Sequence, residues 1–195
     1  MSSDIDNMIY RKGKDMKQEI VDLLLCLDSD DFQEKNNTIS DIAMLLEMNT
    51  YTLNGGQISS GLNEYKCLLS EDLISVRLSI EEQNEIIDEL TKRISVKDKL
   101  SSSMFWAISK SHYTVGLPKL MQIIKCSSDT FDDEVAYQSI IALDNFIIFY
   151  TYKDMKTKLL PMEKKVIDFL HNKSESTNER LAECAKKVLY KSLNI

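Results

Sequence analysis

Glycine and proline are scarce in this sequence, which holds five Gly and two Pro among its 195 residues. Tight turns between strands depend on these residues, because Gly tolerates positive φ and Pro fixes φ. The shortage argues against a β-sandwich or an α/β fold. Long apolar runs are also missing: none approaches the roughly 18 residues of a membrane helix, and residues 1–7 lack the basic and apolar segments of a signal peptide. We expect a helical, cytoplasmic protein without a membrane partner.

Histidine and clustered cysteine, the usual ligands of zinc, are in short supply as well. The histidines are His112 and His171, and the four cysteines stand 41 to 59 residues apart without a Cys-x-x-Cys pair. Such spacing predicts neither a disulfide framework nor a zinc site. Cys26 and Cys184 lie in apolar helical stretches, so we expect both to be buried free thiols that contribute only packing.

Negative charge is concentrated in the first half of the chain. Residues 1–100 carry 20 acidic and 11 basic side chains, a net charge of −9, whereas residues 101–195 carry 11 acidic and 13 basic ones, a net charge of +2. An acidic protein repels nucleic acid and anionic membranes and attracts basic partners. The alternative interpretation is that this charge only keeps the protein in solution. We expect no nucleic-acid partner.

Apolar residues at intervals of three and four predict helices throughout the first half. The first helix is predicted at residues 14–28 and ends in the acidic stretch 28–31, and the second begins at a cap formed by Ser40 and Asp41. Between residues 70 and 94 the apolar positions form a heptad-like stripe, with Gln83 in one core position. Residues 79–82 have the pattern of a capping box, which favours two consecutive helices over one long coiled coil.

A repeated pattern occupies residues 117–193. One predicted helix has Pro118 in its first turn, and a comparable helix has Pro161 there, 43 residues later. Each is followed by a polar turn and a second helix, in which Val135 and Leu181 occupy corresponding positions 46 residues apart. A helix–turn–helix unit of about 40–47 residues is typical of HEAT repeats. This part of the chain resembles the HEAT-like α-helical repeat proteins.

The resemblance implies a stack of helical hairpins. The whole sequence predicts an all-α fold of about eight to ten helices without a sheet, in one domain that spans residues 1–195. Within it we expect a flexible N-terminus at residues 1–12, helical hairpins at residues 14–95 and the HEAT-like half at residues 97–195. The oligomeric state is left undetermined.

Patterns typical of catalysis or metal binding are weak. Asp168 and His171 have the spacing of two ligands on one helix face, but a di-metal site needs several more carboxylates. The acidic stretch at residues 28–31 lacks the Gly and the final Glu of an EF-hand loop, and the acids of residues 129–134 stand at a predicted helix start, which favours negative charge. No Gly-x-Ser-x-Gly motif occurs. We expect no cofactor, no metal and no enzymatic activity.

The acidic half of the chain holds the strongest candidate for a binding surface. Residues 19–34 and residues 71–89 each carry a net charge of −6, and stacked hairpins could place them on neighbouring layers. The predicted partner-binding residues are acidic or aromatic: Asp28, Asp30, Asp31, Glu81, Glu82, Glu85, Tyr150 and Tyr152.

A small, acidic, helical protein without an active site is similar, by general type, to the immunity proteins of bacterial contact-dependent and polymorphic toxin systems. That resemblance implies a protein partner, a basic toxin domain and in particular a nuclease, whose positive surface an acidic inhibitor would cover. A HEAT-like scaffold or adaptor protein is the alternative function, and an enzyme of unknown class is the third.

Overall fold

A computed structural model describes residues 16–53, 69–95, 99–152 and 162–193, without the side chains of residues 148–152 and 193. The predicted flexible N-terminus, residues 1–12, lies outside this part of the chain. Over the described residues the protein consists of nine α-helices and one 3₁₀ turn, and none of these residues is in a strand. The prediction of an all-α fold is confirmed. The helices are α2 (Gln18–Cys26), α3 (Phe32–Leu53), α5 (Glu71–Ser75), α6 (Ile80–Arg93), α7 (Ser101–Ile108), α8 (Tyr113–Ser127), α9 (Asp133–Tyr152), α10 (Lys164–Ser174) and α11 (Glu179–Leu193), with η1 (Ser128–Thr130) between α8 and α9.

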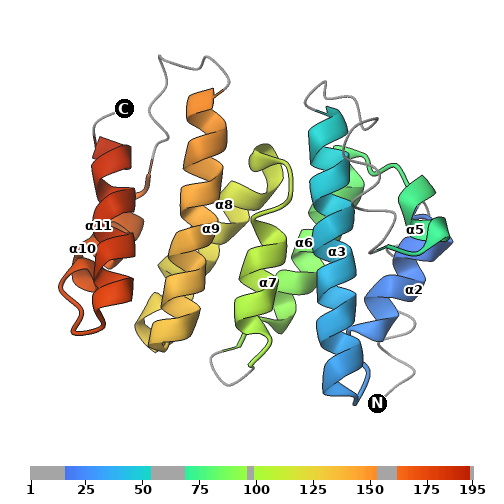
Figure 1. Ribbon diagram of the computed structural model, residues 1–195, viewed down its shortest axis with the longest axis horizontal. Helices are drawn as coiled ribbons and strands as arrows, with labels where there is room; N and C mark the ends of the chain where they lie inside the picture. The colour runs from blue at the N-terminus through green and yellow to red at the C-terminus, as the bar shows by residue number, and fades with distance from the viewer. Residues whose placement is uncertain (1–15, 54–68, 96–98, 153–161, 194–195) are drawn as a thin grey trace.

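The helices form two layers (Figure 1). In the near layer α3, α7, α9 and α11 stand side by side, each packed on the next. In the far layer α6 packs on α8 and α8 on α10, while α2 packs on α3 at the N-terminal end. Consecutive helices therefore alternate between the layers from α6 onward. The repeat relationship to HEAT-like proteins stays a prediction.

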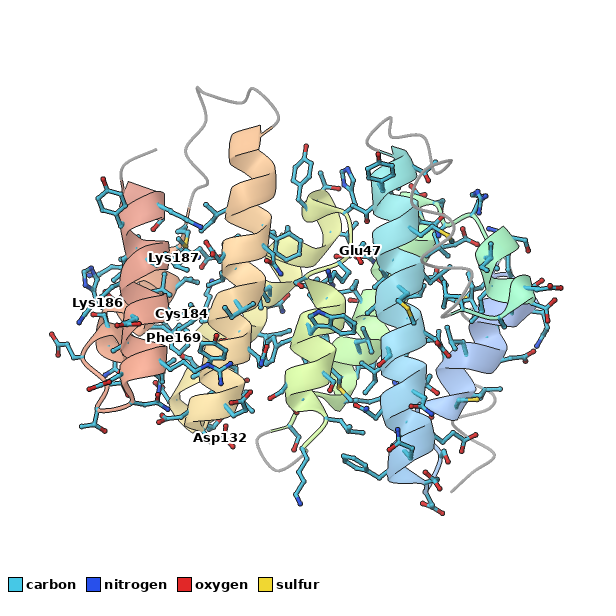
Figure 2. All side chains as sticks on the ribbon, viewed as in Figure 1. Glu47, Asp132, Phe169, Cys184, Lys186 and Lys187 are labelled. Carbon is cyan, nitrogen blue, oxygen red and sulfur yellow. The ribbon has the colours of Figure 1, made fainter. Side chains whose placement is uncertain are left out.

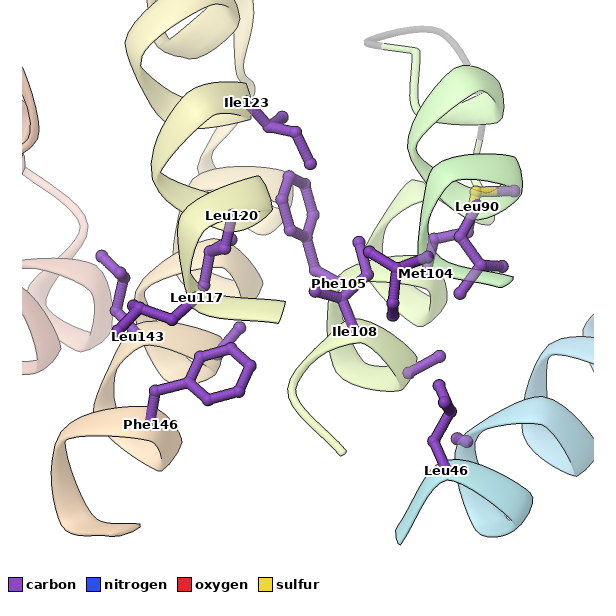
Figure 3. Packing of buried hydrophobic residues seen from close by; sticks show 14 of the residues in the cluster. Leu46, Leu90, Met104, Phe105, Ile108, Leu117, Leu120, Ile123, Leu143 and Phe146 are labelled. Atoms are coloured by element: carbon purple, nitrogen blue, oxygen red, sulfur yellow. The ribbon is translucent and has the colours of Figure 1, made fainter. Parts of the chain in front are cut away.

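Between the two layers lies one cluster of buried apolar side chains. Phe105 on α7 is fully buried in this cluster, and its ring points toward Leu120 and Ile123 of α8 (Figure 3). The ring of Phe131 contacts Phe105 edge-on at a centroid distance of 5.6 Å and contacts Phe169 of α10 in the same way at 6.2 Å. These edge-to-face contacts connect α7 to α10 through the loop before α9. Phe146 and Ile147 of α9 are also buried.

The predicted start of the second helix at Ser40 is wrong. Helix α3 begins eight residues earlier, at Phe32, because the Oδ1 atom of Asp31 accepts the backbone N–H of Glu34 at 2.9 Å. Ser40 lies inside the helix, where its hydroxyl donates to the Asn36 carbonyl one turn earlier instead of capping a terminus. Both residues are good helix caps, and the acidic stretch that was predicted to end one helix begins the next.

The capping box at residues 79–82 is confirmed. Ser79 Oγ accepts the Glu82 N–H, and a Glu82 carboxylate oxygen accepts the Ser79 N–H at 2.8 Å. Because α5 and α6 are separate helices, the alternative of one long coiled coil is excluded. The extended segment between them is held by Asn49, a buried residue whose side chain binds the Val76 carbonyl and the Leu78 N–H.

Pro118 does not lie in a first helical turn as predicted. Helix α8 begins at Tyr113, after His112 caps it through its ring nitrogen, so Pro118 is the sixth residue of the helix. Proline there cannot donate to the carbonyl of Thr114. Gly116 precedes it in a crowded position: a Cβ atom on this glycine would lie 2.1 Å from Ser111 Oγ and 2.5 Å from Phe146 Cζ. The small residue lets α8 approach α7 and α9 closely.

Candidate partner-binding surface

Two ion pairs bring the acidic stretches of α2 and α6 together. Lys17, the residue before α2, binds Glu82 in the first turn of α6 at 2.9 Å, and Asp28, just after α2, binds Arg93 at the end of α6 at 2.9 Å. Both pairs join residues 65 positions apart, so α2 and α6 run in the same direction. We call the outer surface of residues 16–35 and 77–95 the α2–α6 face. It carries eleven acidic and five basic side chains.

Asp28 and Asp31 already have partners within the protein. Asp28 receives two hydrogen bonds from Arg93, from Nε at 3.0 Å and from Nη2 at 2.9 Å. Burial lowers the pKa of Arg93, but the hydrogen bonds from its side chain to Asp28 and Glu89 outweigh that effect and raise it. Asp31 caps α3, and its backbone N–H binds Ser29 Oγ. Both carboxylates therefore shape the turn between α2 and α3.

Asp30, Glu81 and Glu85 are the carboxylates of the predicted set that are free to meet a partner. Asp30 is exposed and Glu85 is half-buried, and neither makes an ion pair with any described residue. Glu81 is exposed too, and hydrogen bonds from its own backbone and from Ser79 lower its pKa, so it is ionised at neutral pH. Glu82 is committed to the capping box and to Lys17. The structure thus divides the six predicted carboxylates into structural and available ones.

Two cations of this surface were missed from the sequence because they stand just outside the acidic stretches. Lys17 comes two residues before Glu19, and Arg93 comes four residues after Glu89. The spacing of Glu89 and Arg93 predicts their contact along one helix, which is present at 2.9 Å. Nothing in the sequence indicates the longer-range contact of Arg93 with Asp28.

Tyr150 and Tyr152, the aromatic residues of the prediction, lie in the last turn of α9. Their side chains belong to the part of the chain that the structure leaves undescribed, so their predicted exposure stays a prediction.

A second surface feature joins α3 and α7 in the near layer. Lys110, two residues after the end of α7, binds Glu47 of α3 at 2.6 Å and lies over the indole ring of Trp106, 5.6 Å from its centroid. Trp106 is 37% exposed. Figure 2 labels Glu47 where α3 faces the end of α7. The aromatic surface is therefore partly covered by an internal cation, which makes it a weaker docking site for a basic partner than the α2–α6 face.

Helices α9 and α11 are joined by a buried carboxylate. The side chain of Asp144 is 6% exposed and binds two lysines of α11, Lys187 at 3.1 Å and also Lys191. Figure 2 shows Cys184 and Lys187 on the side of α11 that faces α9. Burial and the nearby Asp144 raise the pKa of the Cys184 thiol, so the thiol is protonated at neutral pH. This cluster attaches the last helix and has no nucleophile in its reactive form.

The prediction that Cys26 and Cys184 are fully buried is wrong. Both thiols are free and half-buried, because each stands at the edge of an apolar helix face. Cys126 is free and exposed, and Cys67 lies outside the described residues.

The described residues contain neither a cluster of metal ligands nor a membrane-spanning helix. No group of three or more His, Cys, Asp or Glu side chains is placed there to hold a metal ion. Asp168 and His171, the i, i+3 pair, are both exposed on α10. No helix in this part of the chain is both long and apolar enough to cross a membrane. A groove of about 310 Å³ between α6 and α8 contains the Asp88–Lys119 ion pair, at 2.6 Å, above Ile123.

Comparison with protein-family models, curated proteins and solved structures finds no match for this chain.

Proposed function

We propose that this protein is a cytoplasmic binding module, an immunity-type inhibitor that covers a basic toxin domain with its α2–α6 face and performs no catalysis itself. The observation that carries the proposal is the excess of acid on this face. After the internal ion pairs of Asp28 and Glu82 are formed, Asp30, Glu81 and Glu85 remain available to a partner.

The geometry of the face supports rapid binding. Helix α6 has 14 residues, so the face extends over about 20 Å, comparable with one side of a standard protein interface. Glu81 and Glu85 are one helical turn apart, and Asp30 adds charge near the other end of α6. A one-sign field over such an area speeds encounter with an oppositely charged protein and disfavours wrong partners. Nucleases, which bind phosphates with cationic residues, present a surface of the required sign.

The proposal is tested with the product of the gene immediately upstream, where a toxin gene is expected. That product, expressed alone, should arrest bacterial growth, and co-expression of this protein should restore it. In vitro, the double variant Asp30→Lys and Glu85→Lys should lower the association rate constant about tenfold or more at low salt, with a smaller loss at higher salt. Asp168→Lys, an exposed acid on α10, is the matched control and should leave the rate unchanged. Absence of any complex would refute the proposed function.

A HEAT-like scaffold is the second candidate, favoured by the near layer of four helices, each packed on the next. A scaffold would bind several partners without protecting cells from any toxin, so the growth assay separates the two functions.

A further inference from the structure

The turn between α2 and α3 exposes two large apolar side chains inside an acidic surface. Leu25, in the last turn of α2, is 40% exposed, and Phe32, the first residue of α3, is 54% exposed. On the same helix Leu24 is buried in the core, so Leu25 is not needed there. Exposed apolar residues of this size, rimmed by charge, are typical of protein-binding sites.

This turn is held in a defined shape by its own hydrogen bonds. The backbone N–H of Asp28 donates to the Leu25 carbonyl at 3.1 Å, and that of Ser29 donates to the Cys26 carbonyl at 3.2 Å. Ser29 Oγ accepts the N–H of Asp31 at 3.1 Å, and the Arg93 guanidinium fixes Asp28 from outside. Binding would therefore order few additional groups at this point, which lowers the entropic cost of association.

Helix α3 does not require an aromatic residue at the position of Phe32. The preceding residue, Asp31, provides the cap, and the first helical position makes no demand for an aromatic side chain. Acidic side chains surround it in the sequence, with Asp30 and Asp31 before it and Glu34 after it, and all three are exposed. The charge of this rim complements a cationic surface, and the ring at its centre complements an apolar pocket.

We infer that Phe32, with Leu25 beside the same turn, is the apolar anchor of the interface with the basic protein partner. The inference rests on the proposed function and adds the chemistry of the partner's site: an apolar pocket bordered by Lys or Arg. In such interfaces a central aromatic residue contributes most to the lifetime of the complex, while the charged rim contributes to the rate of encounter.

The experiment uses the full chain and the product of the upstream gene as the probe. Phe32→Ala should raise the dissociation rate constant at least tenfold, and this loss should persist at high salt, unlike that of the Asp30→Lys and Glu85→Lys variant. Tyr51→Ala is the matched control, since Tyr51 is 51% exposed at the far end of the same helix, and should change the rate less than twofold. Leu25→Ala is a second, independent test of the anchor and should also raise the dissociation rate constant. An exposed ring supports little of the fold, so the melting temperature of Phe32→Ala should match that of the wild type.

The possible failures are distinguishable. If the wild-type protein forms no complex, both the proposed function and the anchor are refuted. If the wild-type protein binds and both Phe32→Ala and Leu25→Ala bind equally well, only the anchor is refuted. If sedimentation of the protein alone shows a dimer that Phe32→Ala dissociates, the occupant of the surface is a second copy, and the assignment to a basic partner is wrong.

Discussion

The guanidinium of Arg93 binds the carboxylate of Asp28 through two hydrogen bonds, and so connects the end of α6 to the turn that follows α2. Arg93 also binds Glu89 one turn earlier on α6. One cation thus organises two of the acids on the α2–α6 face. Reversing the charge of Asp28 would alter the turn as well as the field, which is why Asp30 and Glu85 are the informative positions for testing encounter.

The first prediction concerns the stability of this contact. Asp28→Asn should lower the free energy of unfolding by about 0.5–1 kcal/mol, because the side chain of Asp28 is 44% exposed and water replaces much of the lost interaction. A double-mutant cycle with Arg93→Gln, measured by urea unfolding, isolates the pair. A coupling energy of zero would show that the two side chains do not interact in solution.

The second prediction concerns Gly116. Alanine at this helical position would gain helix propensity, but its Cβ atom would also lie 2.9 Å from the carbonyl oxygen of Ile108, which cannot move without shifting α7. Overpacking outweighs propensity, so Gly116→Ala should destabilise the fold by about 1–3 kcal/mol. Gln122→Ala, at an exposed position of the same helix, is the control and should change stability little. A Gly116→Ala protein as stable as the wild type would contradict the close approach of α8 to α7.

The third prediction concerns Asp144. Replacing it by Asn keeps its shape but removes the charge that binds Lys187 and Lys191. The cost should be about 2 kcal/mol, less than for a fully buried pair, because the side chain of Lys187 is 61% exposed and becomes hydrated. Chemical denaturation measures the change, and Asp168→Asn on the neighbouring helix should cost under about 0.5 kcal/mol. Equal effects of the two variants would argue against the attachment of α11 through Asp144.

The fourth prediction uses the thiols. Cys126 is exposed and should react with a thiol reagent at neutral pH, whereas Cys184 should react far more slowly, because it is half-buried and its pKa is raised by burial and by Asp144. Mass spectrometry of the labelled protein shows the order in which Cys126 and Cys184 are modified. The labelling rate of Cys184 should still be rising with pH beyond the ordinary thiol pKa of 9.0, because the reactive thiolate fraction levels off only above the raised pKa. Labelling of Cys184 before Cys126 would place that thiol in a different environment.

The fifth prediction concerns pH. Burial raises the pKa of Glu89, but hydrogen bonds from Lys92 and Arg93 outweigh burial, so the pKa lies below the ordinary value of 4.5. The ionised form is favoured in the folded state, so its contribution to stability is present above pH 4.5 and is lost as the pH falls below it. Glu89→Gln should flatten this part of the curve of unfolding free energy against pH. A variant with the same acid dependence as the wild type would exclude Glu89 as a source of it.

The helices were predictable from the sequence because their apolar spacing is regular, but two of their starting points were not. Asp31 and Ser40 are both residue types favoured at a helix N-cap. Which of them begins the helix depends on contacts that join distant parts of the chain. Asn36, which precedes Ser40, receives a hydrogen bond from Ser103 of α7, 67 residues away. His112 likewise opens α8 with a ring nitrogen, a cap that residue preferences do not predict.

The acidic face was predictable only as an excess of charge. Which carboxylates are available depends on Lys17 and Arg93, whose partners are 65 residues away along the chain. Phe32 was not predicted as a surface residue, because a sequence pattern does not distinguish a ring at the first position of a helix from one that turns into the core. The burial of Gln83, by contrast, followed from its heptad position, and its Oε1 atom accepts the His112 N–H.

The side-by-side packing of the near layer also has a consequence for how the protein opens. Helix α11 packs on α9 and on α10, and α10 packs on α8, so the last helical pair rests on one side of the array. Its detachment would leave the contacts among α3, α7 and α9 in place, and subglobal opening should begin there rather than at α7. Amide hydrogens of α10 and α11 should then exchange with solvent ahead of those in α7. Protection against exchange would rise from the C-terminal edge toward Phe105. The acidic face would stay folded while the opposite end of the protein opens locally.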